Sequence, residues 1–159
     1  MSLRTRVLAG LMGVFFLCGV GCKKKQPMAS DLFNDAAKVD AGLPYPVMEW
    51  RALTTGVDRG MGTTFTLFGN DAAVAAARAG QPYAAGAVLG LVTWRQKEDA
   101  HWFGGRIPDA PVGVEFVEYG PGLAPVYRHF AGTPMVEQAD SGGAGRIAAI
   151  EGMKVAALP

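Results

Sequence analysis

The sequence predicts an α+β domain, built on an antiparallel β-sheet of about five strands with one or two packed helices. Three observations favour this fold class: short segments that alternate apolar and polar residues, one alanine-rich segment with helix signals at both ends, and spacers of hairpin length. The chain has 159 residues and a formal net charge of +1, so it lacks the basic excess of nucleic-acid-binding proteins.

The strand candidates differ in how they are expected to be covered. Residues 63–68 place Phe65 and Leu67 on one face, which is typical of a half-buried strand. Residues 87–96 are apolar on both faces, which predicts a central strand covered on both sides. One of its faces carries Leu89 and Leu91, and the other carries Val88, Val92 and Trp94. The other candidates are residues 50–55, 112–119 and 126–130.

One helix has clear signals. Asn70 is a favourable N-cap, residues 72–79 are rich in alanine, and Gly80 is a favourable C-terminal stop. A short helix is also possible at residues 31–39. Residues 142–145 predict a flexible turn, while residues 146–158 fit a helix or a strand equally well.

The first residues have the layout of a secretory signal. Arg4 and Arg6 precede an uncharged apolar run at residues 7–20, which is shorter than the roughly 20 residues of a membrane-spanning helix. Gly21 and Cys22 follow, as in a bacterial lipoprotein signal. We therefore expect a signal peptide at residues 1–21, a tether at residues 22–43 and a folded domain at residues 44–159.

Cys22 is the expected lipidation site, where acyl chains such as palmitate would anchor the protein to a membrane. The expected location is the cell envelope, facing the periplasm, with the outer membrane favoured over the inner one in a Gram-negative cell. An ordinary secreted protein cut near Gly21 and an uncleaved anchor are the alternatives. Cys18 and Cys22 are the only cysteines, so the expected mature domain has no disulfide and no thiolate ligand.

The segment from Glu98 to Pro111 is interpreted as an unusual long loop, of the kind that is often functional. Its aromatic residues Trp102 and Phe103 could wall an apolar pocket, with His101 as a ligand and Arg106 as an anion contact. Alternatively, the two aromatic side chains pack down and close one end of the sheet. The complete candidate pocket comprises Trp94, His101, Trp102, Phe103, Arg106 and His129.

No residue is assigned a catalytic role, and whether the protein is an enzyme stays open, with a binding role favoured. The two histidines lie far apart in the sequence, so we expect no metal site. Glu115 shares a strand face with Val117. We expect its carboxylate to be solvated, or else paired with Arg95 or Arg106.

Taken together, these segments resemble the cytochrome P-460 family, whose fold is shared with the beta-type c-prime cytochromes. The resemblance covers residues 44–159. It rests on Gly69-Asn70-Asp71, Tyr83–Leu89, Val92-Thr93-Trp94, His101–Gly104, Arg106-Ile107-Pro108 and Val114–Val117.

The resemblance implies an antiparallel sheet with helices and, in its best-known members, c-type haem on a Cys-x-x-Cys-His motif near the C-terminus. Residues 153–159 contain neither cysteine nor histidine. We therefore expect no covalent haem and no cofactor, and a membrane-tethered module that binds a small apolar ligand or another envelope component. The alternative is a redox or gas-binding protein that holds haem non-covalently through His129 or His101.

Overall fold

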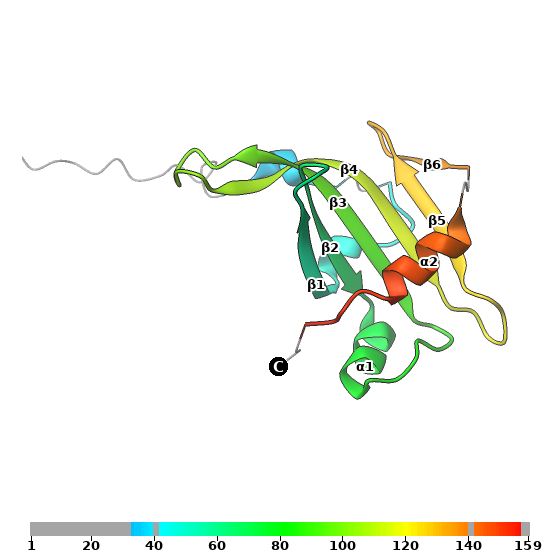
Figure 1. Ribbon diagram of the computed structural model, residues 1–159. Coiled ribbons are helices and arrows are strands. Elements are labelled where there is room, and N and C mark those ends of the chain that lie inside the picture. Colours follow the sequence, from blue (N-terminus) through cyan, green and yellow to red (C-terminus); the bar gives the residue numbers. More distant parts are fainter. Residues whose placement is uncertain (1–32, 40–41, 140–141, 157–159) are drawn as a thin grey trace, which may run out of the picture.

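The computed structural model describes residues 33–39, 42–139 and 142–156, which form a six-stranded antiparallel sheet with two α-helices (Figure 1). The strands follow one another in space as they do in the chain, so every strand pairs with its sequence neighbour. They are β1 (Arg51–Asp58), β2 (Thr63–Gly69), β3 (Val88–Glu98), β4 (Arg106–Glu118), β5 (Val126–Ala131) and β6 (Val136–Gln138). The helices are α1 (Asp71–Ala79), α2 (Gly143–Glu151) and the short 3-10 turns η2 (Asp35–Ala37) and η3 (Val47–Glu49).

The predicted fold class is confirmed, with one more strand than expected. The five candidate segments correspond to β1 to β5, whereas β6 was missed. All three residues of β6 are exposed, so its sequence has no apolar alternation that would reveal it.

Helix α1 begins and ends where its signals predicted. The Asn70 side chain accepts a hydrogen bond from the backbone N–H of Ala73 at 3.0 Å, and Gly80 adopts the left-handed conformation with φ of 63°. Asn70 also joins the helix to the start of β3, because its Oδ1 accepts from the Val88 N–H and its Nδ2 donates to the Gly86 carbonyl. This cap therefore fixes the connection between β2 and β3.

Strand β3 lies in the middle of the core, covered on both faces as predicted. The even-numbered face carries Val88, Val92 and Trp94, which pack with Phe116 and Phe130 of β4 and β5. The opposite face, which we call the helix face, carries one continuous apolar cluster beneath α1 and α2. Its buried members are Leu53, Leu67, Ala73, Val74, Ala87, Leu89, Leu91, Val117 and Ile150.

The even-numbered face is covered by the N-terminal segment, residues 33–39 and 42–50. Val47 is buried there, and Ala37, Val39 and Leu43 pack against the same cluster. The Trp94 indole N–H donates to the Ala37 carbonyl at 2.9 Å. The packed part of the chain thus begins before the expected boundary at residue 44. Of the possible helix at 31–39, the described residues contain only the turn η2.

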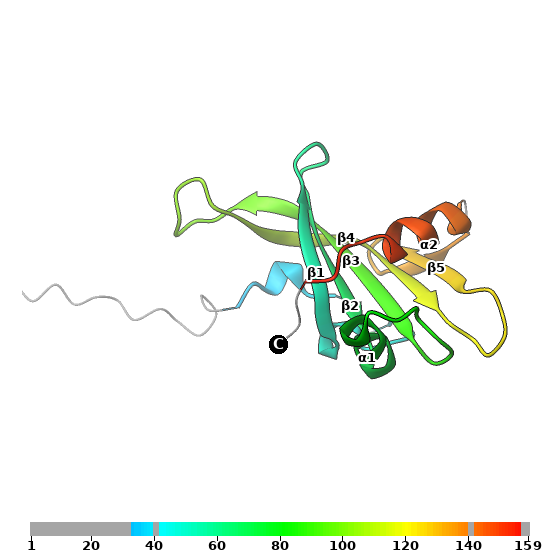
Figure 2. The ribbon, with the colours of Figure 1, turned by 60° about the horizontal axis from the view of Figure 1, so that its bottom comes forward.

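The prediction of a long loop from Glu98 to Pro111 is wrong. Strand β3 continues to Glu98 and β4 starts at Arg106, so only residues 99–105 connect them, and the two strands form a hairpin arm that extends beyond the sheet (Figures 1 and 2). Pro108 and Pro111 lie within β4. They are tolerated because this part of β4 pairs with β3 alone, with register shifts on either side of Trp94.

The predicted flexible turn at residues 142–145 is also wrong, because α2 starts at Gly143. The ambiguous segment 146–158 is helical as far as Glu151. Beyond it the chain runs along β1, where the Ala156 N–H donates to the Leu53 carbonyl at 2.9 Å. Tertiary packing explains the helix, since Ile150 is fully buried on the helix face.

The predicted signal segment and Cys22 lie outside the described residues. Within the described part of the chain, no helix combines the length and the apolar character that a membrane crossing needs.

Candidate functional site

A cluster of interacting polar side chains lies where α2 crosses β4 and β5 on the helix face. Arg146 of α2 makes two hydrogen bonds to Glu115 of β4, from Nε to Oε1 and from Nη2 to Oε2, both at 2.7 Å. The Tyr127 hydroxyl of β5 donates to the same Oε1. His129 is the register partner of Glu115 on β5. The expectations of a solvated Glu115, or of one paired with Arg95 or Arg106, are therefore wrong.

The surroundings of Glu115 keep its carboxylate ionised. Burial favours the neutral form, since only 12% of the side chain is exposed. The hydrogen bonds from Arg146 and Tyr127 and the charges of Arg146 and His129 outweigh that burial and hold the pKa of Glu115 below its ordinary value. Burial, together with the bond to this carboxylate, raises the pKa of the Tyr127 hydroxyl. Tyr127 is therefore a neutral donor and Glu115 an anion.

This ion pair predicts a measurable pH dependence of stability. Because the folded-state pKa of Glu115 is lowered, its stabilisation is complete above the ordinary value of 4.5 and is lost as the pH falls through the folded-state pKa. Glu115→Gln should lower the free energy of unfolding at pH 7 by about 1–3 kcal/mol. This loss is smaller than that for a fully buried ion pair, because Arg146 is partly exposed and solvent screens its charge. Urea unfolding from pH 7 to pH 3 should then find the gap between wild type and variant closing below pH 4.5.

Glu98→Gln is the matched control, because Glu98 is a strand carboxylate with no ion pair among the residues that the structure describes. A gap between wild type and Glu115→Gln that stayed constant down to pH 3 would contradict the assignment.

Two hollows flank this cluster, and Tyr127 lines both of them. The smaller cavity, of about 280 Å³, is lined by Glu115, Tyr127, His129, Ala139, Gly142 and Arg146. The larger hollow is a groove of about 570 Å³ between α2 and β5, which we call the α2–β5 groove. Its lining is mostly apolar: Ala124, Pro125, Val126, Tyr127, Gly143, Ala144, Ile147, Ala148 and Glu151.

The carboxylate of Glu151, at one end of the α2–β5 groove, is held in place by a hydrogen bond. Glu151 accepts a hydrogen bond from the Tyr119 hydroxyl at 2.7 Å. Burial and the neighbouring Glu151 carboxylate raise the pKa of Tyr119, so this hydroxyl stays protonated as the donor. The groove thus combines small apolar side chains of α2 with one positioned carboxylate.

The six residues of the predicted candidate pocket are not brought together. Trp94 is a core residue, 4% exposed, on the even-numbered face. His129 lines the small cavity on the helix face. His101, Trp102 and Phe103 lie in the turn of the β3–β4 hairpin arm, and Arg106 lies at the start of β4.

Both predictions for the aromatic residues of the hairpin turn are wrong. Trp102 and Phe103 are exposed, so they neither wall an apolar pocket nor close the end of the sheet. The physical reason is the length of the arm, which carries the turn beyond the strands that could cover it. His101 is exposed as well, with its Nδ1 3.5 Å from Asp99.

Arg146 and Tyr127 were not predicted from the sequence as site residues. Their partnership with Glu115 spans 31 and 12 positions in the chain. One feature of the sequence could have indicated them: Glu115 is a charged residue at an inward-facing position of a strand, and a buried charge requires a partner. The sequence did not indicate which of the arginines supplies it.

In the described part of the chain, one antiparallel sheet flanked by two short helices, with a groove between α2 and β5, defines an α+β sheet protein. Residues 45–122 match the family model described as Cytochrome P460, so the chain has a cytochrome P460-like domain. The match spans β1 to β4 with α1, while Tyr127, His129 and Arg146 lie beyond it. No curated protein matches the chain.

Proposed function

We propose that this chain is a membrane-anchored envelope lipoprotein whose cytochrome P460-like domain carries no haem and binds a small apolar or amphipathic ligand. Cys22 would be the lipid anchor, and the domain would face the periplasm. The observation that carries the binding role is the α2–β5 groove. Its volume of about 570 Å³ lies within the range of small-molecule sites, and its lining is apolar with few polar groups.

The groove suits an elongated ligand with an apolar body. Gly143, Ala144 and Ala148 leave room along α2, because their side chains are small. Val126 of β5, which is half exposed, offers apolar surface on the opposite side of the groove. Glu151 would meet a hydrogen-bond donor or a cation at one end of the ligand. No chemical step is proposed for this site.

The surroundings of the two histidines support a domain without haem. His129 opens into a cavity of about 280 Å³, below the usual range for even drug-sized ligands, and the Glu115–Arg146 pair lines the same space. Ile147 and Ile150 fill the space between α2 and the sheet. His101 stands on an exposed turn without apolar walls. These residues do not fit a porphyrin with an axial histidine.

Binding in the groove is tested with the neutral fluorescent apolar probe N-phenyl-1-naphthylamine and a series of alkylammonium amphiphiles that compete with it. Ala148→Phe should fill the groove and weaken binding by about tenfold or more. Ala75→Phe is the matched control, because Ala75 is also exposed, on α1 and away from the groove. Equal binding by wild type and Ala148→Phe would reject the groove as the site.

The absence of haem is tested by the absorption spectrum of the protein isolated from its native envelope, followed by haem titration. We expect no Soret band on isolation and no saturable shift on titration. A saturable shift that disappears in His129→Ala or His101→Ala would instead support the alternative of a redox or gas-binding haem protein.

The lipid anchor is tested separately by metabolic labelling with radioactive palmitate and by membrane fractionation. Wild type should carry the label and sediment with membranes, and Cys22→Ser should carry no label. A label that persists in Cys22→Ser would reject this residue as the anchor.

A further inference from the structure

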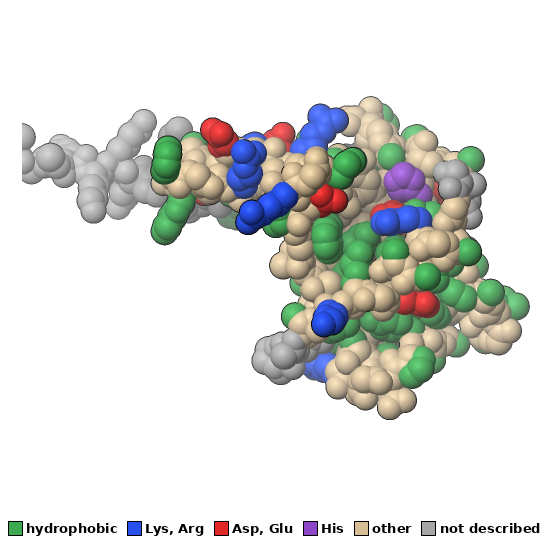
Figure 3. Space-filling view, in the orientation of Figure 1, with side chains coloured by type: hydrophobic (Ala, Val, Ile, Leu, Met, Phe, Trp, Pro, Cys, Tyr) green, Lys and Arg blue, Asp and Glu red, His purple; other side chains and the backbone are tan. Residues whose placement is uncertain are grey.

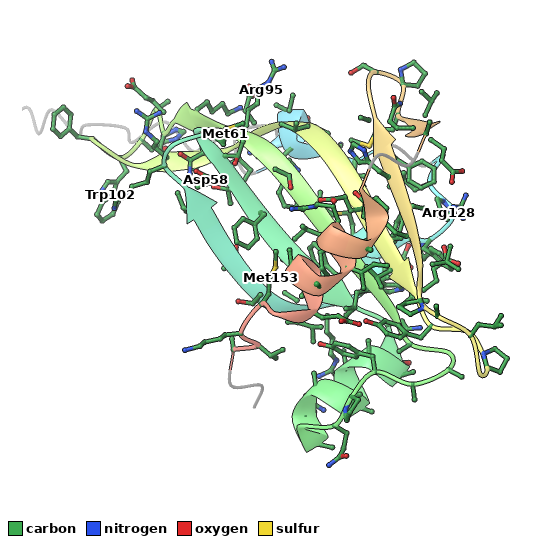
Figure 4. All side chains as sticks on the ribbon, turned by 45° about the vertical axis from the view of Figure 1, so that its right-hand side comes forward. Asp58, Met61, Arg95, Trp102, Arg128 and Met153 are labelled. Atoms are coloured by element: carbon green, nitrogen blue, oxygen red, sulfur yellow. The ribbon has the colours of Figure 1, made fainter. Side chains whose placement is uncertain are left out.

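The end of the β3–β4 hairpin arm carries large apolar side chains that nothing in the described structure covers. Trp102 and Phe103 are 73% and 104% exposed in the turn, and Met61 is 77% exposed in the β1–β2 turn. Both turns lie at the same end of the sheet, because Thr63 pairs with Arg95 near the point where the arm leaves it. Figure 4 shows Trp102 projecting away from the sheet at the end of the arm. Exposed aromatic side chains at one extremity indicate a binding surface.

The N-terminal segment leads the chain to this same arm. The Asn34 side chain donates to the Pro108 carbonyl of β4 and accepts from Lys97 of β3 at 3.1 Å. Phe33, at the start of the described residues, is 70% exposed. Only residues 23–32 separate Phe33 from Cys22, a span of at most about 40 Å. A lipid on Cys22 would therefore keep Phe33, and the start of the segment that contacts the arm, within about 40 Å of the bilayer surface.

A cleft that carries two arginines lies between the two hairpins at this end. It measures about 670 Å³ and is lined by Val57, Arg59, Gly62, Thr64, Gln96, Gly104, Arg106 and Pro108. Neither arginine makes an ion pair within the described part of the chain. In Figure 3, Lys and Arg side chains lie along the arm together with Asp and Glu side chains, and hydrophobic side chains lie at its end. Guanidinium groups bind phosphate oxygens in a bidentate manner.

We propose that this end of the sheet is a bilayer-docking surface: Trp102 and Phe103 enter the interfacial region of the membrane, while Arg59 and Arg106 contact lipid phosphates. The inference rests on the proposed anchor at Cys22. Tryptophan is enriched at membrane interfaces, and each cation near an anionic surface adds attraction. The contact orients the domain, because Pro125 and Val126 of the α2–β5 groove lie at the opposite end of β4 and β5.

The test is the fluorescence of the full-length, membrane-bound protein reconstituted in vesicles of phosphatidylethanolamine and phosphatidylglycerol, with and without brominated acyl chains. Bromine quenches tryptophans that enter the bilayer. Trp94 is buried and Trp50 packs against the same core, so quenching should come from Trp102. Trp102→Phe should reduce the quenching about threefold or more. The double variant Arg59→Gln/Arg106→Gln should reduce it more in anionic vesicles, where surface charge adds to the phosphate contact, than in neutral phosphatidylcholine.

The matched control moves the reporter to the other end of the molecule. Leu123 is also 73% exposed, in the turn between β4 and β5. Leu123→Trp in the Trp102→Phe background should show no bromine quenching. Equal quenching from both positions, or none from Trp102 in vesicle-bound protein, would overturn the docking surface and leave the anchor intact. Failure of the full-length protein to associate with membranes would overturn both.

Discussion

Replacement of Trp94 by alanine is expected to lower the free energy of unfolding by about 3–5 kcal/mol. Trp94 is 4% exposed and lies on β3, within the cluster on the even-numbered face. Its indole N–H holds the N-terminal segment through the Ala37 carbonyl, so the substitution also leaves that acceptor without its donor. Urea unfolding, followed by circular dichroism, measures the loss.

Trp102→Ala provides the control for this prediction. It removes the same side chain from an exposed turn and should change the free energy of unfolding by no more than about 0.5 kcal/mol. Similar losses for the two variants would contradict the assignment of Trp94 to the core. A third variant, Trp94→Phe, retains part of the apolar volume and lacks the hydrogen bond, and it should fall between wild type and Trp94→Ala.

Replacement of Phe116 by alanine is expected to have a comparable effect, about 3–5 kcal/mol. Phe116 is fully buried at the centre of an aromatic cluster. Its ring makes edge-to-face contacts with Tyr45, Phe130 and Trp50, at centroid distances of 5.3, 5.8 and 6.3 Å. The substitution opens a cavity between the sheet and the N-terminal segment, which thermal or urea unfolding would detect.

Phe116→Leu tests whether the cavity causes this loss. It keeps most of the apolar volume and should cost about 1–2 kcal/mol. Phe103→Ala, at the exposed turn, should be nearly neutral. A loss from Phe116→Ala no larger than that from Phe103→Ala would show that the N-terminal segment does not close the core.

The sequence predicted the parts of the fold that depend on local patterns. Alternation located β2 and β4, and apolar residues on both faces identified β3 as the covered strand. Asn70 and Gly80 located the ends of α1, because caps are set by neighbouring residues. Elements were predicted correctly where the residues that determine them are close together in the sequence.

Errors arose where distant pairing overrides local preference. Proline and glycine around residues 104–111 are typical of a loop, yet pairing with β3 makes Arg106 to Pro111 a strand. Gly143 and Gly145 weaken a helix, yet the burial of Ile150 retains α2. These positions are governed by tertiary contacts that a single sequence does not reveal.

Of the candidate site, His129 alone was both predicted and found in the cluster beside Glu115. Arg146 and Tyr127 approach Glu115 only once α2 and β5 are folded over β4. Glu115 was expected to be solvated or paired with Arg95 or Arg106, because nothing in the sequence distinguishes Arg146 from the other arginines. The contacts between α2, β5 and β4 at this site could therefore not be predicted from the sequence.

The next-neighbour order of the six strands bears on how the polypeptide acquires its structure. Apart from the β2–β3 connection, which carries α1, neighbouring strands are joined by short loops, so the entropy lost in closing these pairs is small and the sheet can grow from its leading strand as residues emerge. Residues 33–39 and 42–50 contribute to the even-numbered face only once β3 and β4 exist to receive them. We therefore expect a polypeptide stalled after β2 to expose the apolar face of an incomplete sheet, which chaperones or proteases would recognise.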